Sequence, residues 1–221
     1  MPAQLLTGLE GRAAAVTATI GPLAGACASV LTERGANSML LLDGDRLPED
    51  LQVLVAILDG APMPLPDAPN SDADDWEAAV GGLAGSLYRA VRHAAAAMAA
   101  IGGGSIVVIA PEAGLVGVRG ASVMAGAAGG LFAAARALAI EYARIVRINM
   151  ISYSCVEGDP YSDWLLAEDP NGTRALGDPL TLLERLAAPE EVATAAAFLA
   201  SDRASFIVAH QLVVDGGYVV H

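Results

Sequence analysis

Apolar runs of strand length alternate along the chain with longer segments in which small and apolar residues recur at helical spacing. The runs occupy residues 13–17, 38–42, 51–58, 105–110, 146–151 and 211–214. Strands without internal polar alternation are typical of a parallel sheet that helices cover on both faces. The pattern predicts an α/β fold, a Rossmann-like doubly wound parallel sheet of about six strands.

The segments between these runs predict the helices. They cover about 22–34, 75–99, 123–144 and 189–199. Pro22 at the first helical position and Gly35 after the last favour these limits for the first helix. Residues 155–178 carry Pro160, Pro170 and several acidic side chains, so we expect an irregular insert there. Because no internal repeat or linker is visible, residues 1–221 are predicted to form a single domain.

Charge narrows the range of partners. A net charge of −13 argues against nucleic acid and against an anionic membrane surface, since both are bound by clustered basic residues. All twelve basic residues are arginine, so no mechanism that needs a lysine ammonium group is available. Cys27 and Cys155 lie far apart and are expected to be free thiols, with no metal-ligand spacing around them. No signal-peptide pattern or membrane span is evident, and a cytoplasmic protein is expected.

Several ordered segments together resemble the short-chain dehydrogenase/reductase family. They are LEGR at 9–12, GSIVVI at 104–109, RALAIE at 136–141, RIN at 147–149, PEEVA at 189–193, FLASD at 198–202 and VDGG at 214–217. The resemblance runs the whole length of the chain apart from one deletion. It implies the Rossmann fold and, in an intact member, hydride transfer with a nicotinamide cofactor.

The family's phosphate loop, Thr-Gly-x-x-x-Gly-x-Gly, is degenerate here. The aligned stretch 17–24 reads TATIGPLA, so Ala18, Pro22 and Ala24 replace the three glycines. Those glycines let a pyrophosphate approach the bare backbone and the helix N-terminus. The alanines are expected to place Cβ atoms in that approach, and Pro22 removes an N–H group. Asp43 stands where the family keeps the acid that holds the NAD ribose, and without the loop we interpret it as a strand-end residue.

The family's catalytic residues are also replaced. The resemblance places Pro111 at the serine, Met124 at the tyrosine, Ala128 at the lysine and Gly82 at the assisting asparagine. In the family the lysine lowers the pKa of the tyrosine, which is the general acid/base, and the serine orients the carbonyl. We therefore predict no catalytic residues, no cofactor-binding residues, no metal and no bound cofactor.

A deletion accompanies these replacements. Only seven residues lie between Asp43 and Leu51, where the family has a helix, a strand and a further helix. A parallel crossover with a helix needs at least about ten residues. The sheet is therefore expected to lack the third-strand unit, which forms part of the adenine pocket in the family.

The two long central helices are rich in small residues. Residues 94–97 are all alanine, and 125–130 read AGAAGG. Glycine inside a helix costs roughly 0.8–1 kcal/mol relative to alanine, so Gly129 and Gly130 need a reason. Close approach of a second subunit is one, because these helices form the main subunit interface in the family; tight packing within the monomer is the other. The apolar C-terminus at 218–221 lies where the family makes its second interface.

These observations predict a non-catalytic subunit that assembles with a catalytically active short-chain dehydrogenase paralogue, as a heterotetramer. The class is similar to heteromeric hydroxyacyl-CoA dehydrogenases in which one subunit is degenerate, such as that of the benzylsuccinate pathway. Two alternatives stay open. The first alternative to the subunit is a ligand sensor that binds a nucleotide or acyl-CoA without turnover. The second is an oxidoreductase with unconventional chemistry. Against the second, the three histidines at 93, 210 and 221 are scattered and form no catalytic cluster.

Overall fold

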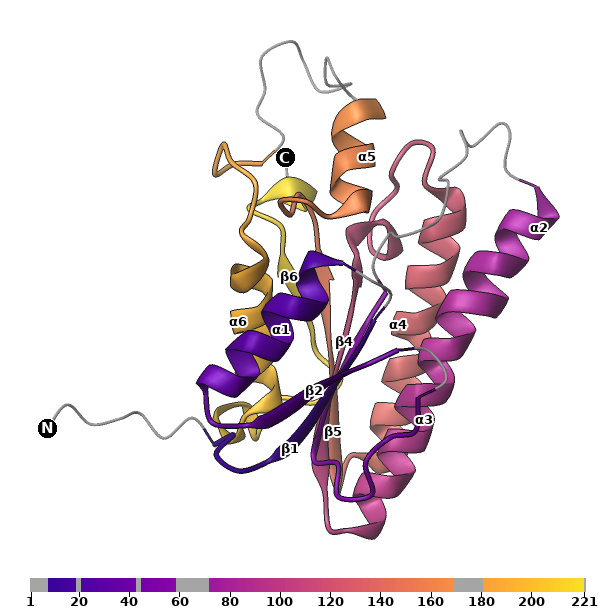
Figure 1. Ribbon diagram of the computed structural model, residues 1–221. Helices are drawn as coiled ribbons and strands as arrows, with labels where there is room; N and C mark the ends of the chain where they lie inside the picture. The colour runs from indigo at the N-terminus through magenta and orange to yellow at the C-terminus, as the bar shows by residue number, and fades with distance from the viewer. Residues whose placement is uncertain (1–7, 19–20, 43–44, 59–71, 169–180, 221) are drawn as a thin grey trace, which may run out of the picture.

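The computed structural model describes residues 8–18, 21–42, 45–58, 72–168 and 181–220. Its centre is a six-stranded parallel sheet with the strand order β2-β1-β3-β4-β5-β6 (Figure 1). The strands are β1 (Ala13–Ala18), β2 (Asn37–Leu41), β3 (Val53–Ile57), β4 (Gly104–Pro111), β5 (Val146–Tyr153) and β6 (Gln211–Val214). The predicted fold class is confirmed, because the apolar runs form the strands of one parallel sheet with helices on both faces.

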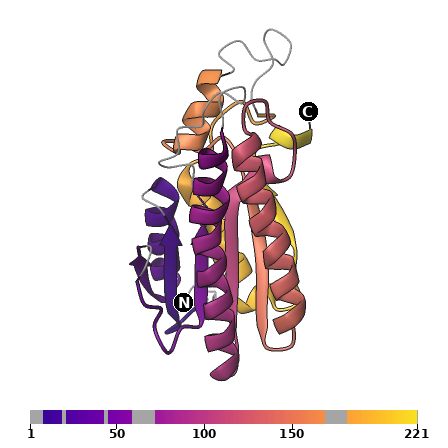
Figure 2. The same ribbon diagram turned by 90° about the vertical axis from the view of Figure 1, so that its right-hand side faces the viewer.

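Helices cover both faces of the sheet. On one face α1 (Pro22–Glu33) packs beside α6 (Pro189–Ala200), and on the other α3 (Gly85–Ala100) packs beside α4 (Ser122–Tyr142) (Figures 1 and 2). Each layer has its own apolar core against the sheet. The central strands β3 and β4 are buried almost without exception, which explains why their sequences show no polar alternation.

A long helical rod precedes β4. It consists of α2 (Ala73–Trp76), η2 (Glu77–Ala84), which has π-helical hydrogen bonding, and α3. The helix therefore begins at Ala73, two residues before the predicted start at about 75. Asp72 caps it: the Asp72 carboxylate accepts from the backbone N–H of Asp75 at 3.0 Å, and the Asp75 carboxylate accepts from the N–H of Asp72 at 3.1 Å. This reciprocal capping box satisfies N–H groups that a helix start leaves unpaired.

The expectation of an irregular insert after Cys155 is wrong for its described part. Residues Pro160–Glu168 form helix α5, which follows β5 (Figure 1). The Asp159 carboxylate accepts from both the backbone N–H (2.9 Å) and the hydroxyl (3.0 Å) of Ser162, as a helix N-cap does. Proline at a first helical position favours a helix start. The remainder of the predicted insert, 169–178, lies outside the described residues.

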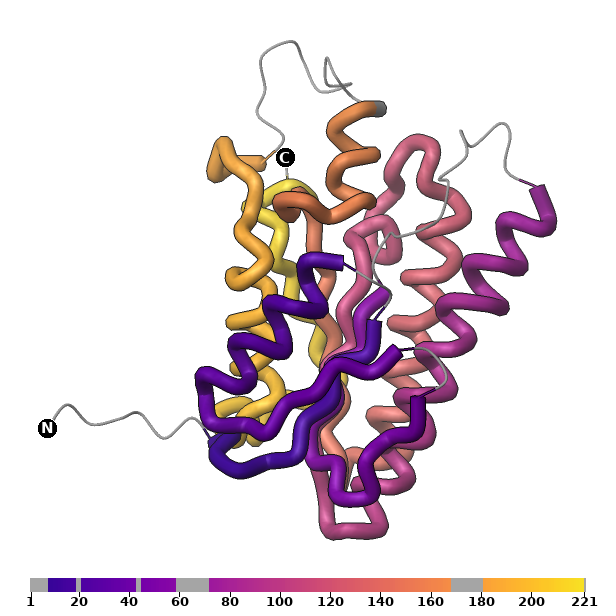
Figure 3. Tube along the Cα trace, viewed as in Figure 1, coloured from indigo at the N-terminus to yellow at the C-terminus, as the bar shows by residue number. Residues whose placement is uncertain are grey.

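The sheet is shortened as predicted. Strand β1 pairs with β2 on one side (Val16 opposite Leu40) and with β3 on the other (Val16 opposite Val55). The described part of the connection between β2 and β3 contains no helix and no further strand, and its short path is visible beside α3 in Figure 3. Asp43 lies outside the described residues.

Arg147 fixes the far end of α6 to the sheet. Its guanidinium, on β5, donates to four backbone carbonyl oxygens at and beyond the end of α6, those of Leu199, Ala200, Ser201 and Ala204, at 2.9–3.3 Å. The last carbonyls of a helix have no partner inside the helix, and a fixed cation satisfies them. Arg147, in the Arg-Ile-Asn segment, thus has a structural role, which is to join the end of α6 to the sheet.

Within the described part of the chain, α4 alone is long and apolar enough to cross a bilayer by length and composition. Half of its apolar window is buried within the fold, where it packs against β4, β5 and α3. The helix is therefore accounted for as a core element. Cys27 and Cys155 are both buried free thiols, as expected, and burial raises the pKa of the Cys27 thiol to about 12.

Candidate functional site

The degenerate phosphate loop lies at the carboxyl end of β1 and the start of α1. Thr17 and Ala18 end the strand, and Gly21 is the N-cap of α1 in an extended conformation that any residue adopts (φ −154°). Pro22 follows at the first helical position, so the N–H group it would contribute to an anion is missing. Residues 19 and 20 lie outside the described part.

Ala24 differs from the expectation. Its side chain is buried (8% exposed) in the core beneath α1, so its methyl group contributes to helix–sheet packing and does not project towards a ligand. The predicted obstruction of the phosphate loop is therefore limited to Ala18 and Pro22. Gly25 would meet nothing within 4 Å if it carried a Cβ, so no close approach of backbone requires a glycine there.

The residues predicted to replace the family's serine, tyrosine and lysine lie in a closed, mainly apolar part of the core. Met124 and Ala128, one turn apart on α4, are both fully buried. Pro111 ends β4 and is buried too, whereas Gly82 is exposed on η2, which packs on α4.

The short helix η3 (Glu112–Gly114) lies directly against these positions. A Cβ built on Gly114 would lie 2.8 Å from the Cβ of Ala128 and 2.7 Å from the backbone nitrogen of Gly129. Real Cβ atoms do not approach other atoms so closely, so glycine is needed at 114. The backbone of η3 at Gly114 therefore lies in direct contact with α4 at Ala128.

Glu112 is a buried acidic residue with a shifted pKa, and its sequence context did not mark it as a candidate site residue. Its side chain is fully buried, and its Oε1 accepts a 2.8 Å hydrogen bond from the hydroxyl of Tyr161 on α5. Its Oε2 has no hydrogen-bond partner within the described residues. Burial raises the pKa of Glu112 to about 7, against the lowering effect of the bonds from Tyr161 and Ser154. Raised carboxyl pKa values in closed sites are characteristic of acid/base groups, and also of structural networks.

Three further buried groups continue this network. The hydroxyl of Tyr153 donates to Asp159 at 3.1 Å, and Ser162 accepts from the backbone N–H of Val156 at 2.9 Å. Burial is the main cause that raises the pKa of Asp159. These contacts join α5 to the ends of β4 and β5. The sequence carried one signal for them, namely that Glu112 stands alone between apolar residues after a buried strand.

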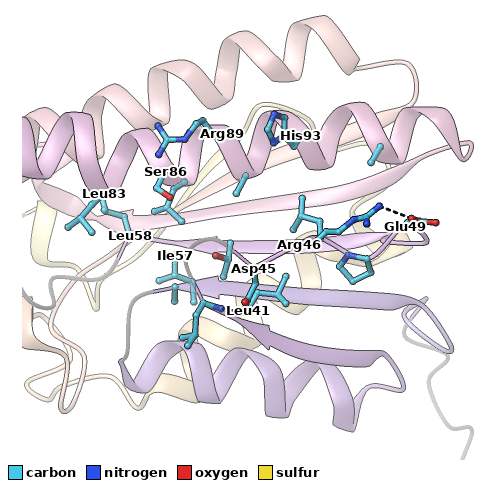
Figure 4. A pocket seen from close by; sticks show the side chains of 18 residues that line it. Leu41, Asp45, Arg46, Glu49, Ile57, Leu58, Leu83, Ser86, Arg89 and His93 are labelled. Carbon is cyan, nitrogen blue, oxygen red and sulfur yellow. Dashed lines mark hydrogen bonds and ion pairs between the residues drawn. The ribbon is translucent and has the colours of Figure 1, made fainter.

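A pocket of about 630 Å³ lies at the edge of the sheet, between α3 and the connection from β2 to β3 (Figure 4). The carboxyl ends of β1, β2 and β3 close one end of it, with Thr17 and Ala18 among the lining residues. Arg89 and His93 lie along the α3 side, opposite Leu41 and Asp45. His93, one of the three scattered histidines, is exposed and lines this pocket.

A family model described as enoyl-(acyl carrier protein) reductase matches residues 49–219. The cis-4-hydroxycyclohexanecarboxylate dehydrogenase of Sinomonas cyclohexanicum is 36% identical over 182 residues, which cover 79% of this chain and 69% of that protein. The chain belongs to the short-chain dehydrogenase/reductase family. The predicted family membership is therefore confirmed.

Other relatives of this short-chain dehydrogenase/reductase chain carry oxidoreductase names. The cyclopentanol dehydrogenase of Comamonas testosteroni is 32% identical over 85% of this chain and 72% of its own length. The cyclohexanol dehydrogenase of Acinetobacter sp. (strain SE19) is 34% identical, and the alignment covers 66% of this chain and 55% of that protein. The chain thus spans between about half and three quarters of these relatives.

Solved structures of other proteins share the fold of this chain. A short chain dehydrogenase/reductase family protein superposes with a TM-score of 0.76 at 29% identity, covering 96% of this chain and 100% of that one. The crystal structure of gox2181 superposes with a TM-score of 0.79 over 98% of both chains, at 23% identity, a likeness that shows the fold alone.

The sequence left two explanations for the glycines of α4, namely contact with a second subunit and tight packing within the monomer. Gly126 lies beneath the Trp76 ring, which a Cβ would approach to 2.5 Å, and Gly129 lies beside the backbone of Gly114. Packing within the chain therefore accounts for Gly126. A Cβ on Gly129 would lie 3.6 Å from the carbonyl oxygen of Gly114, an ordinary van der Waals contact that does not by itself require a glycine. Gly130 is exposed, with nothing within 4 Å of a Cβ placed there, so no contact within the described chain explains it.

Proposed function

We propose that this chain is a non-catalytic short-chain dehydrogenase/reductase subunit that assembles with a catalytically active paralogue, as a heterotetramer. One observation carries the proposal. Met124 and Ala128 stand at the tyrosine and lysine positions, both fully buried, with the Gly114 backbone packed against Ala128. The side chains at these two positions pack in the core and offer no group that could transfer a proton. Such a change supports a subunit whose fold is retained while hydride transfer is lost.

The available chemistry supports the same proposal. Hydride transfer in this family needs a proton donor at the substrate oxygen and a cation that lowers the pKa of that donor. The chain contains no lysine, and the carboxyl group nearest to Met124 in sequence is that of Glu112. Because Glu112 is fully buried and bonded to Tyr161, no substrate oxygen reaches it in this conformation.

The residues present do not fit a nicotinamide dinucleotide. Pro22 donates no N–H at the helix start, and Ala18 replaces the glycine that admits the pyrophosphate. The short connection after β2 also leaves out the wall that holds adenine in the family. The chain is therefore not expected to transfer a hydride with this cofactor. Among the described residues, no group of three or more His, Cys, Asp and Glu side chains is placed to hold a metal ion.

A surface on α4 is suited to the partner. Gly130, Ala133, Ala137 and Ile140 are exposed along one side of the helix at spacings of three and four residues, and Ile140 is 79% exposed. Small side chains allow close approach of a second helix pair, and an exposed Ile gains from burial. This is the region through which intact members of the family associate.

The partner's reaction would be an NAD-dependent oxidation of a secondary alcohol, because the named relatives act on cyclic alcohols. A hydroxyacyl-CoA substrate, as in the benzylsuccinate pathway, is the other class that the degenerate-subunit resemblance implies. The expected compartment is the cytoplasm. A ligand sensor is the alternative that the structure gives most reason to keep, since the chain carries a sizeable pocket.

The test is isolation of the chain, tagged, from its native cells, with the bound proteins identified by mass spectrometry. We expect an equimolar short-chain dehydrogenase with an intact Tyr-x-x-x-Lys motif and alcohol-dependent NAD reduction by the complex. Reconstitution of the two purified subunits should reproduce the native mass. A chain that is isolated as a stable monomer or as a homo-oligomer alone, with no such paralogue, would contradict the proposal.

A further inference from the structure

The pocket beside α3 owes its existence to the shortened sheet. In a doubly wound fold the crossover from one strand to a distant one carries a helix that covers the strands it passes. Here the connection after β2 is too short for a helix, and its residues 45–49 instead form one side of the pocket. The cavity thus occupies space next to the sheet that a longer chain would fill with its own side chains.

The walls of the pocket are mainly apolar. Leu83, Leu87 and Ala90 line it from the long helical rod at spacings of three and four residues. Leu58, directly after β3, and Leu47, on the connection, line it from the other side. Ligand pockets are typically about 300–1,000 Å³ with a mostly apolar lining and a few placed polar groups. A volume of about 630 Å³ lies within that range.

The polar side chains on the two sides of the pocket differ in whether they already form hydrogen bonds or ion pairs. On the connection, the Asp45 carboxylate accepts a 2.8 Å hydrogen bond from the backbone N–H of Leu42, and Arg46 pairs with Glu49 at 2.8 Å. On α3, Arg89 and His93 lie one turn apart and line the same pocket. Neither side chain has a hydrogen bond or ion pair with any of the described residues. The cationic side is thus the side open to a ligand.

We propose that this pocket binds an amphipathic monocarboxylate, with its aliphatic chain along Leu83, Leu87 and Ala90 and its carboxylate at Arg89 and His93. A guanidinium binds a carboxylate through two parallel N–H···O bonds, which fixes the head group. The chain as a whole carries a charge of −13, so non-specific attraction of anions is not expected. Binding of an anion therefore has to come from this local pair. The proposal is independent of whether the chain is a subunit or acts alone.

The experiment is isothermal titration calorimetry of the full chain with decanoate, with decan-1-ol as the neutral probe of equal chain length and with AMP as a nucleotide probe. We expect decanoate to bind at least about tenfold more tightly than decan-1-ol, because the alcohol lacks the charge-assisted bonds. AMP binding tighter than decanoate would overturn the proposal and favour a nucleotide site. Absence of decanoate binding at millimolar concentration would also overturn it.

Three variants localise the site. Arg89→Gln should weaken decanoate binding by about tenfold while leaving decan-1-ol binding within about twofold. Ala90→Trp should abolish both by filling the apolar part. Arg92→Gln is the matched control, since Arg92 is exposed on the same helix but does not line the pocket. Circular dichroism verifies that each variant is folded. Equal losses in Arg89→Gln and Arg92→Gln, or unchanged decanoate affinity in folded Ala90→Trp, would place the ligand elsewhere.

Discussion

The hydroxyl of Tyr161 lies 2.8 Å from Oε1 of Glu112, and both side chains are fully buried. The two residues are 49 positions apart, one on α5 and one on η3. Their contact joins α5 to the short helix that follows β4. Because Oε2 of Glu112 lacks a partner among the described residues, the neutral acid is the form that this environment favours.

We predict that Glu112→Gln flattens the pH dependence of stability. The pKa of Glu112 is about 7 in the folded chain and about 4.5 in the unfolded chain. Between these values the native state keeps a proton that the unfolded chain releases, so the stability of the wild type falls as pH rises. The shift corresponds to roughly 3 kcal/mol at about 1.4 kcal/mol per pH unit.

The measurement is urea denaturation of wild type and Glu112→Gln at pH 5 and pH 8. The variant should gain stability relative to wild type at pH 8 and differ little at pH 5. Glu157→Gln, an exposed carboxyl with no resolved role in the core, is the control and should leave the profile unchanged. Parallel pH profiles for wild type and Glu112→Gln would contradict the assignment.

Restoration of the family's tyrosine and lysine should not restore activity. The double substitution Met124→Tyr with Ala128→Lys is expected to give no NAD-dependent oxidation of cyclopentanol or cyclohexanol, because the phosphate loop is degenerate independently. Ala128→Lys alone should destabilise the fold by several kcal/mol, since it overpacks the contact with Gly114. Stopped-flow assays and thermal denaturation test the two parts. Hydride transfer above background in the double variant would show that a cofactor site survives.

The purified chain should bind neither NAD nor NADP with micromolar affinity. Pro22 removes an N–H group at the start of α1, and Ala18 replaces the first glycine of the loop. Isothermal titration with both nucleotides tests this, and the active paralogue serves as the positive control. A dissociation constant in the micromolar range for either would overturn the interpretation of the loop.

Gly130 and Gly129 should respond differently to enlargement. Gly130→Leu places a side chain in open space on the monomer, so it should leave folding intact and weaken association with the paralogue. Gly129→Leu should destabilise the monomer itself, because its Cβ side faces the backbone of Gly114. Size-exclusion chromatography together with circular dichroism separates the two effects. Normal assembly of Gly130→Leu would exclude this part of α4 from the interface.

The sequence by itself determined the fold class, the absence of lysine and the shortened sheet. Each of these can be read from local features: apolar runs of strand length, residue identities at a motif, and a count of residues between Asp43 and Leu51. Strand and helix propensities act over neighbouring residues, so their pattern survives in the linear order. The helix α5 was missed because its cap depends on Asp159, and its packing on Tyr161, in a segment rich in proline and acid.

Only the tertiary structure decided what fills the spaces between elements. The contact of Glu112 with Tyr161, the packing of Gly114 on Ala128 and the reason for Gly126 each join residues from different elements. The pocket beside α3 likewise depends on a helix, three strand ends and a connection meeting at one place. Such contacts have no periodic signature, because they follow from the packing of finished elements and not from the conformational preference of any single segment.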